Sequence, residues 1–219
     1  MDDGRSLNQP PSKLGRPVRE PGDQVYDALL AAAEECLKIH TYRQITVRQV
    51  AKIAGVNPSM INYYFNGKKG LYAGLIGHVF AQWKQSLQQI EMSMKNSRFD
   101  PVHALVTAVN QCFYVHKSVV ALLSYEISQP DSDVREAYLK HHASRSSSAV
   151  RMFIETGIQT GHFRRDLQPT FLSFAITALA MHPLSLGDNL SPSFGFSQET
   201  LLSLDWQTFL EKTLRHMLC

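Results

Sequence analysis

Acidic residues are missing from a long stretch of this chain. No Asp or Glu occurs between Glu35 and Glu91, although seven Lys and Arg residues do. The whole chain has 22 basic residues against 19 acidic ones, and all of the excess lies in the first 80 residues. A helical segment with only positive charge suits a surface that lies against phosphates. On charge alone, a chance gap on an ordinary solvated face explains it equally well.

Cysteine and long apolar runs are scarce as well. The three cysteines, Cys36, Cys112 and Cys219, form no CxxC pair, and their odd number argues against a disulfide framework. No apolar run approaches the roughly 20 residues of a membrane-spanning helix, and the N-terminus has no apolar signal core. We therefore expect a soluble protein of the cytoplasm, with one large or two small domains in 219 residues.

The familiar motifs of catalysis and of metal or cofactor binding are absent. The sequence has no Glu-x-x-His, HExxH, GxSxG or GxGxxG. The segment Gly67-Lys68-Lys69 lacks the upstream glycine and the Ser or Thr of a P-loop. These absences argue against an enzyme, and we expect neither a cofactor nor a metal site.

Residues 1–23 differ in composition from the rest. They hold four of the ten prolines and almost no apolar side chains, so we expect a disordered basic arm. Arg16 and Arg19 are placed to reach a DNA minor groove from there. An idle tail fits this composition at least as well.

Apolar residues recur at helical spacing from Asp23 to the end, and no convincing strand alternation occurs. This pattern predicts an all-α chain of about nine helices. The expected helices cover 23–37, 47–54, 58–65, 68–96, 101–117, 118–128, 133–160, 169–182 and 198–218. A loop rich in Pro, Gly, Ser and Asn is expected from 183 to 195.

Residues 46–70 combine two helix caps, a glycine turn and a short polar helix. Thr46 is a good N-cap, Gly55 supplies a sharp turn, and Asn57 is a second N-cap. Pro58 follows at the first helical position, where its missing N–H costs nothing. A helix from Pro58 to Phe65 is only about 12 Å long, so it fits end-on into a major groove about 12 Å wide. The segment therefore predicts a helix-turn-helix that reads DNA.

The side chains of this short helix divide into two sets. The inward positions are Val56, Ile61 and Phe65, and the outward ones are Ser59, Met60, Asn62, Tyr63 and Tyr64. Asn can bond adenine through two hydrogen bonds, Ser can bond several base edges, Met can contact a thymine methyl group, and Tyr hydroxyls suit phosphates. Packing of Tyr63 or Tyr64 on the first helix, and simple capping by Asn57, are the alternatives.

These residues resemble the TetR family of bacterial transcriptional regulators. The family's pattern Thr-x-x-x-Ile/Val-Ala, Ala-Gly-Val-Ser, Tyr-x-x-Phe and Ser-Lys-Glu-x-Leu is met by Thr46, Val50-Ala51, Ala54-Gly55-Val56, Tyr63-Tyr64-Phe65 and Lys68 with Leu71. Further on, Gly157-x-x-x-Gly161-x-Phe163-Arg164 is similar to the family's Gly-x-Phe-Arg turn. The chain departs from the pattern in three places. Asn62 stands where an aromatic is common, Lys69 replaces the usual Glu, and Asn57-Pro58 replaces a Ser-Lys start.

The resemblance implies a three-helix DNA-binding domain at 24–70 and a larger helical domain for effector binding and dimerisation at 71–219. It implies that Thr46, Tyr63 and Lys68 hold phosphates. The base-reading candidates are Arg48, Ser59, Met60 and Asn62, and Asn57, Pro58 and Tyr64 complete the candidate DNA-binding set. The family's usual mode is repression by a homodimer on a palindromic operator, with release by a small-molecule effector.

One reading helix makes too few contacts for operator-level affinity, so we expect two, about 34–36 Å apart on double-stranded DNA. Residues 169–182 are apolar on more faces than one small domain can bury. Together with 198–218 they form the expected homodimer surface, and the small Ala175, Ala178 and Ala180 would permit close approach. A fully internal core helix at 169–182 is the alternative.

The resemblance also implies a pocket for an unknown small effector in the helical domain. Its candidate residues are His103, Asn110, Tyr114, Tyr125, Glu126, Met152, Phe153 and His182. Taken singly, each is more often a satisfied or surface residue. Glu126, a carboxylate after an apolar run, suits either a cationic ligand or an arginine partner. The alternative function is a helical interaction module of the same architecture without operator or effector binding.

Overall fold

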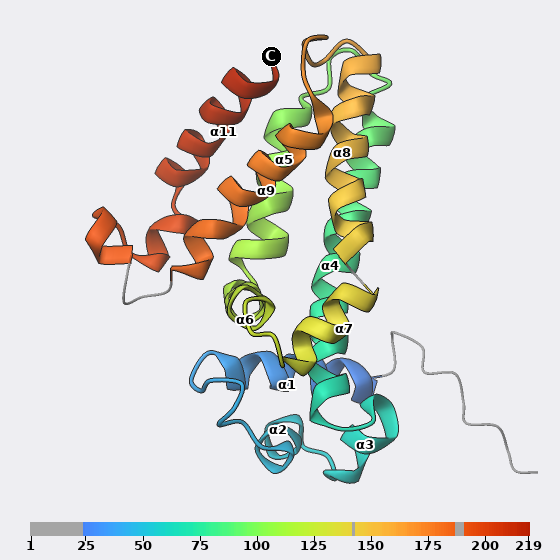
Figure 1. Ribbon diagram of the computed structural model, residues 1–219, viewed down its shortest axis with the longest axis vertical. Coiled ribbons are helices and arrows are strands. Elements are labelled where there is room, and N and C mark those ends of the chain that lie inside the picture. The colour runs from blue at the N-terminus through green and yellow to red at the C-terminus, as the bar shows by residue number, and fades with distance from the viewer. Residues whose placement is uncertain (1–23, 142, 187–190) are drawn as a thin grey trace, which may run out of the picture.

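The computed structural model describes residues 24–141, 143–186 and 191–219, and the predicted arm at 1–23 lies outside them. Within the described residues the chain forms ten α-helices, two 3-10 helices and one π-helical turn, with no β-strand (Figure 1). The all-α prediction is confirmed. One predicted helix, 133–160, is described as two, α7 (Asp133–His141) and α8 (Ala143–Gln159), on either side of residue 142.

The predicted DNA-binding end consists of three short helices that pack on the start of a long one. They are α1 (Gln24–Leu37), α2 (Val47–Ala54) and α3 (Ser59–Phe65), followed by α4 (Lys68–Ser93). Figure 1 shows α4 running from this end into the rest of the molecule. The centre is sealed by Leu29, Val50, Ile61 and Leu71, which are all at most 1% exposed.

The remaining helices pack around the upper part of α4. They are α5 (Pro101–Val109), the π turn η1 (Asn110–Tyr114), α6 (Lys117–Ile127), α7, α8, α9 (Pro169–Ser185), the 3-10 helices η2 (Ser191–Phe194) and η3 (Gln198–Leu202), and α11 (Leu204–Leu218). Helix α4 packs against α5, α7 and α8, α9 lies on α8, and α11 lies on α5. None of the described helices is long and apolar enough to cross a membrane.

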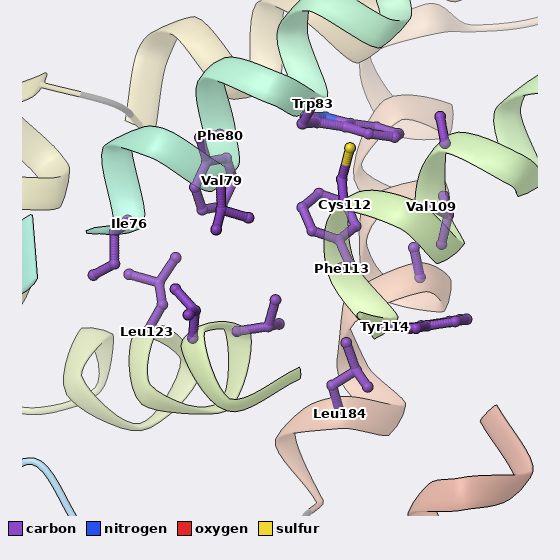
Figure 2. Packing of buried hydrophobic residues seen from close by; sticks show 14 of the residues in the cluster. Ile76, Val79, Phe80, Trp83, Val109, Cys112, Phe113, Tyr114, Leu123 and Leu184 are labelled. Atoms are coloured by element: carbon purple, nitrogen blue, oxygen red, sulfur yellow. The ribbon is translucent and has the colours of Figure 1, made fainter. Parts of the chain in front are cut away.

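The core of this domain is built on one stripe of α4 that the spacing of three and four residues predicts to be buried. All six of its members are buried: Leu71, Leu75, Val79, Trp83, Leu87 and Ile90. Figure 2 shows Val79, Phe80 and Trp83 of α4 facing the side chains of η1. The rings of Trp83 and Phe113 lie 4.8 Å apart. The long helix α4 is therefore shared, because its first turns complete the DNA-binding domain and its later turns form the core of the helical domain.

Two expected boundaries were wrong. Pro183 was expected to begin a loop, yet it lies buried in the last turns of α9, and its carbonyl accepts a hydrogen bond from Gln198 Nε2 at 2.9 Å. Tertiary packing at a helix end outweighs the usual effect of proline there. The last helix was expected from 198, but Ser203 caps α11 by accepting a bond from Trp206 N at 3.2 Å, so residues 198–202 form a separate 3-10 helix.

The end of α8 and the turn after it have a geometry that requires glycine at two positions. Gly161 has a φ of +79°, in the left-handed region where glycine carries no steric penalty. A Cβ on Gly157 would lie 2.0 Å from the ring of Phe163, so only glycine lets that ring reach the core. Phe163 is 3% exposed and stacks edge-on against Phe153. The Gly-x-Phe-Arg segment thus fixes how the chain passes from α8 towards α9.

Candidate nucleic-acid interface and ligand cavities

Helix α2 is held by residues close to it in sequence. Thr46 Oγ1 accepts a hydrogen bond from Gln49 N at 3.3 Å, and Thr46 N donates to Gln49 Oε1 at 2.7 Å, which completes a capping box. At the other end Gly55, with a φ of +68°, caps the helix through its N–H. The predicted cap and turn are confirmed. They place Arg48 and Lys52 on an exposed face of α2.

Helix α3 follows the same local logic. Asn57 Oδ1 accepts a hydrogen bond from Ser59 N at 2.9 Å, but the helix begins at Ser59 and Pro58 holds the N-cap position, so the predicted start lay one residue too early. Asn66, with a φ of +59°, ends the helix in the left-handed region. Ile61 and Phe65 face inward as predicted, at 0% and 7% exposure. The residues between these caps present a short polar surface beside α2.

The two adjacent tyrosines have different surroundings. The ring of Tyr64 lies 6.2 Å from Tyr26 of α1, so Tyr64 is the tyrosine that packs on the first helix. Tyr63 is 39% exposed and remains at the outer face. Of the other candidates, Thr46, Arg48, Asn57, Pro58, Ser59 and Asn62 are exposed, whereas Met60 is half-buried against the core. The structure therefore gathers most of the predicted DNA-binding set on one end of the molecule.

Lys68 lies differently from the other candidates. Its Nζ donates to the carbonyl of Tyr42, in the segment between α1 and α2, and sits 4.3 Å from the centre of the Tyr42 ring. Partial burial lowers the pKa of Lys68, while the Glu126 carboxylate acts in the opposite direction. The ammonium is thus engaged inside the domain, and a phosphate contact by this side chain would require the bond to Tyr42 to break.

The neighbouring Lys69 points to the helical domain. Its Nζ lies 3.1 Å from Asp133 Oδ1 and 2.8 Å from Glu136 Oε2, both on α7. The hydrogen bond to Glu136 raises the pKa of Lys69, and the same bond lowers the pKa of Glu136. One base of the acid-free stretch is therefore balanced by acids more than 60 residues away in sequence. The net positive surface is carried by residues such as Arg48 and Lys52.

Two family models match this chain. Residues 29–75 match the model for bacterial regulatory proteins of the tetR family, and residues 100–203 match the model for a tetracyclin repressor-like C-terminal domain. The chain belongs to the TetR family of transcriptional regulators. The two matched ranges correspond to the helices that form the DNA-binding end and to most of the helical domain.

Similar proteins agree with this assignment. The chain is 25% identical over 193 residues to the HTH-type transcriptional repressor NicS of Pseudomonas putida, covering 86% of this chain and 89% of that protein. In fold it is similar to a TetR-family transcriptional regulator from Rhodococcus sp., with a TM-score of 0.68, 18% identity, and coverage of 90% and 99% of the two chains. It is also similar to reduced NemR of E. coli, with a TM-score of 0.62, 19% identity, and coverage of 90% and 99%.

The predicted effector residues of this TetR-family regulator do not form one site. His103 is exposed and pairs with Glu211 Oε2 at 3.0 Å, and His182 and Met152 are exposed as well. Phe153 is 0% exposed and packs on Phe163, so it is a core residue. These four residues come from α5, α8 and α9, and none of them lines either of the two cavities described below.

Two other candidates, Asn110 and Tyr114, are the first and last residues of the π turn. Tyr114 is buried, its hydroxyl accepts a hydrogen bond from Trp206 Nε1 at 2.8 Å, and burial raises its pKa to about 12. Asn110 has the one sealed side-chain nitrogen or oxygen atom without a hydrogen bond among the described residues, its Nδ2. The last two candidates, Tyr125 and Glu126, line the same cavity. Only this pair was brought together as predicted.

A cavity of about 470 Å³, which we call the aromatic cavity, lies between α4, η1, α7, α8 and α9. Five aromatic side chains line it: Phe80, Trp83, Phe113, Tyr138 and Phe174. The hydroxyls of Ser173 and Thr177 already donate to helix carbonyls at 2.8 Å each. The charged residue in the cavity lining is Arg151. None of the eight predicted effector residues lines this cavity.

A second cavity, the interdomain cleft, has a volume of about 950 Å³. It lies between residues 37–43 of the DNA-binding domain and Lys117 to Glu126 of α6, with Leu184 and Gln198 behind them. Figure 1 shows α6 directly above α1 and the segment that follows it. His116 Nδ1 pairs with Glu34 Oε1 at 2.9 Å, which ties α1 to the start of α6 beside this cleft.

At three positions the residue that lines the aromatic cavity is the direct neighbour of a predicted effector residue. Phe113, Arg151 and Met181 line it, and they directly precede the predicted Tyr114, Met152 and His182. One residue turns a side chain by about 100° around a helix axis. The signal that would have found the cavity is the aromatic pair Phe80 and Trp83, which lie three residues apart on α4 and therefore share a face.

Proposed function

We propose that this TetR-family regulator is a repressor that binds a palindromic operator as a homodimer and is released by a small-molecule effector. The observation that carries the DNA-binding part is the exposed face of α2 and α3. It is acid-free, presents hydrogen-bonding side chains, and rests on helices whose caps are already satisfied. Such a face suits contacts with phosphates and with base edges. Lys68 would contribute through the N-terminus of α4, because its ammonium is bound to Tyr42.

The DNA-binding proposal is tested with double-stranded DNA from upstream of the protein's own gene. Arg48→Ala should lower the affinity about tenfold or more, because it removes one exposed cation from the proposed contact face. If Arg48 contacts a phosphate, the slope of log affinity against log salt should also fall by about one. Arg98→Ala is the matched control, since Arg98 is an exposed arginine in the loop after α4. Equal binding by Arg48→Ala and the parent would contradict the assignment, and no selective binding by the parent would favour the interaction module.

The homodimer proposal is supported by the exposed faces of α9 and α11. Phe171 and Phe174 of α9 are 72% and 77% exposed, and Leu204 and Phe209 of α11 are 76% and 52% exposed. This finding contradicts the alternative of a fully internal helix at 169–182. Large apolar side chains gathered on two helices are typical of a surface that another subunit covers. We propose that two copies pack α9 and α11 into a four-helix interface.

Light scattering after size-exclusion chromatography tests this surface. The parent should have the mass of two 24.7 kDa chains, and Phe171→Glu should shift it towards one. Met92→Glu is the control, because Met92 is 62% exposed on α4 and lies outside the proposed interface. A monomeric parent, or a Phe171→Glu variant that stays dimeric at micromolar concentration, would contradict the proposal.

For the effector we propose the aromatic cavity. Its volume of about 470 Å³ lies in the range of small-molecule sites, and its aromatic walls suit a flat apolar molecule. Arg151 lines the cavity and pairs with Glu155 Oε1 at 3.6 Å, so an acidic group on that molecule would take the place of Glu155. Aromatic carboxylic acids are therefore the first compounds to screen by thermal shift and by loss of operator binding.

A cavity-filling variant tests the location. Ala180 is 3% exposed and lines the cavity, so Ala180→Phe should remove the stabilisation that a bound compound gives the parent. Ala81→Phe, at an exposed position of α4, is the matched control and should keep it. Unchanged stabilisation of Ala180→Phe by the same compound would place the effector elsewhere.

A further inference from the structure

The interdomain cleft contains a nearly buried carboxylate that is only half bonded. Glu126 is 5% exposed, and its Oε2 accepts a hydrogen bond from Ser132 Oγ at 2.6 Å. Among the described residues no partner bonds its Oε1, and the one sealed unpaired side-chain atom there is Asn110 Nδ2. Oε1 therefore opens to the cleft that Glu126 lines. Among the described residues no salt bridge reaches this carboxylate, and Lys68 acts on it only through longer-range electrostatics. A cation that enters the cleft can therefore bond to it directly.

Aromatic rings lie on the walls of the same cleft. Tyr125 is 56% exposed and precedes Glu126 on α6, and Tyr42 lines the opposite wall in the DNA-binding domain. The Tyr42 ring already holds one cation, since the Lys68 ammonium lies 4.3 Å from its centre. Tyrosine faces attract organic ammonium groups in this way, and a neighbouring carboxylate strengthens the attraction.

Basic residues also border the cleft, but their charged groups are largely exposed to solvent. Lys38, His40 and Arg43 are exposed, and Lys38 is paired with Glu35 at 2.5 Å. Lys117 is half-exposed at the start of α6. Exposed charges are screened by solvent and salt, whereas a charge near the protein interior acts at close range in a lower dielectric. The buried Glu126 therefore decides the sign of the ligand's inner end.

We propose that the interdomain cleft binds an organic ammonium compound, with its charged group against Glu126 and its apolar part between Tyr42 and Tyr125. This site is distinct from the aromatic cavity, and one of its walls belongs to the DNA-binding domain. A cation seated here competes with Lys68 for Tyr42 and Glu126, and it thereby loosens the bond that joins the start of α4 to the segment before α2. We infer that occupancy weakens operator binding, and this coupling rests on the proposed function.

The test is calorimetric binding of benzyltrimethylammonium to the full chain, with phenylacetate as its oppositely charged counterpart. The ammonium should bind and phenylacetate should not bind at the same site. Glu126→Gln keeps the shape but removes the charge, and it should weaken ammonium binding at least tenfold. Glu91→Gln, at a half-buried carboxylate far along α4, is the matched control and should bind as the parent does. Tyr125→Ala, at an exposed position, should weaken binding severalfold without affecting folding.

Several results would overturn the proposal. These are no ammonium binding at millimolar concentration, equal binding by Glu126→Gln, or loss of ammonium binding in the cavity-filling Ala180→Phe. Preferential binding of phenylacetate that persists in Ala180→Phe, where the aromatic cavity is filled, would show that the basic rim of the cleft decides the charge. Direct binding is measured without DNA, so it stands or falls independently of operator recognition. Ammonium binding that leaves operator affinity unchanged would overturn the coupling alone.

Discussion

The DNA-binding domain and the helical domain treat their polar groups differently. In the first, Thr46 bonds with Gln49, Asn57 with Ser59, and Lys68 with Tyr42. These polar side chains therefore find their hydrogen-bond partners inside the domain. In the second, Asn110 Nδ2 and Glu126 Oε1 lack hydrogen-bond partners among the described residues, and both cavities border its helices. The first domain is therefore a rigid platform whose outer surface is available for binding DNA. The second keeps internal space and unmet polar groups, which a ligand can use.

The largest expected difference concerns core packing. Ile61→Ala in the DNA-binding domain removes a side chain that is 0% exposed and away from any described cavity, so it should cost about 4–5 kcal/mol of unfolding free energy. Ile176→Ala borders the aromatic cavity, where the lost atoms made fewer contacts, and should cost about 2–3 kcal/mol. Urea denaturation of both variants measures this. Equal costs would remove the packing part of the comparison.

Loss of a cap should have a smaller effect. Thr46→Ala breaks the capping box of α2 and should lower the unfolding free energy by about 1 kcal/mol. Thr46→Ser keeps the hydroxyl and should restore most of the loss. Urea denaturation with a helical circular dichroism signal is the measurement. If Ser and Ala behave alike at this position, the hydroxyl of Thr46 contributes nothing and the platform is less firmly held than described.

The opposite sign is expected in the helical domain. Asn110→Leu replaces an amide whose Nδ2 is sealed and unpaired by an apolar side chain of similar size, so it should raise the unfolding free energy by about 1 kcal/mol. Gln49→Leu provides the contrast, because Gln49 is bonded and its replacement should destabilise. Thermal unfolding of the two variants decides the matter, and destabilisation by Asn110→Leu would show that the amide is satisfied in solution.

The smallest effect concerns acid. Burial raises the pKa of Asp100, but hydrogen bonds from Arg215 and from the backbone outweigh it and leave that pKa below its usual value. Hydrogen bonds from His103 and Arg215 lower the pKa of Glu211. Carboxyls with depressed pKa values stabilise the folded state above about pH 4 and lose this contribution as the pH falls through the lowered values. Arg215→Met should therefore be less stable than the parent at pH 7 by well under 1 kcal/mol, since these groups are largely exposed. The gap should close in strong acid, and a gap that persists there would mean that Arg215 acts through packing.

Much of the fold could be predicted from sequence because its signals are local. Thr46, Gly55 and Asn57 act on residues within four positions, so the helix-turn-helix was placed almost residue by residue. The stripe of α4 was equally clear, since its period is set by the helix itself. Pro183 and Ser203 were misjudged, because one depends on contacts 15 residues away and the other is a cap hidden in an apolar pattern.

The ligand cavities could not be predicted in the same way. A cavity wall is set by how several helices rotate against each other, and a rotation of one residue exchanges Phe113 for Tyr114. The partners of Lys68 and Lys69 show the same limit. Lys69 meets Asp133 and Glu136 only because α7 folds back on the start of α4. Local charge counting therefore overstated the positive charge that is available to DNA.

The link from Lys69 to α7 also affects how operator binding responds to salt. Added salt weakens contacts with DNA phosphates through counterion release, and it screens the exposed pairs of Lys69 with Asp133 and Glu136 at the same time. If breaking these salt bridges changes the orientation of the DNA-binding domain, the measured slope of log affinity against log salt has two contributions. One comes from the phosphate contacts and the other from the loss of the salt bridges within the protein. Lys69→Met would separate the two, because its slope contains the phosphate contacts alone.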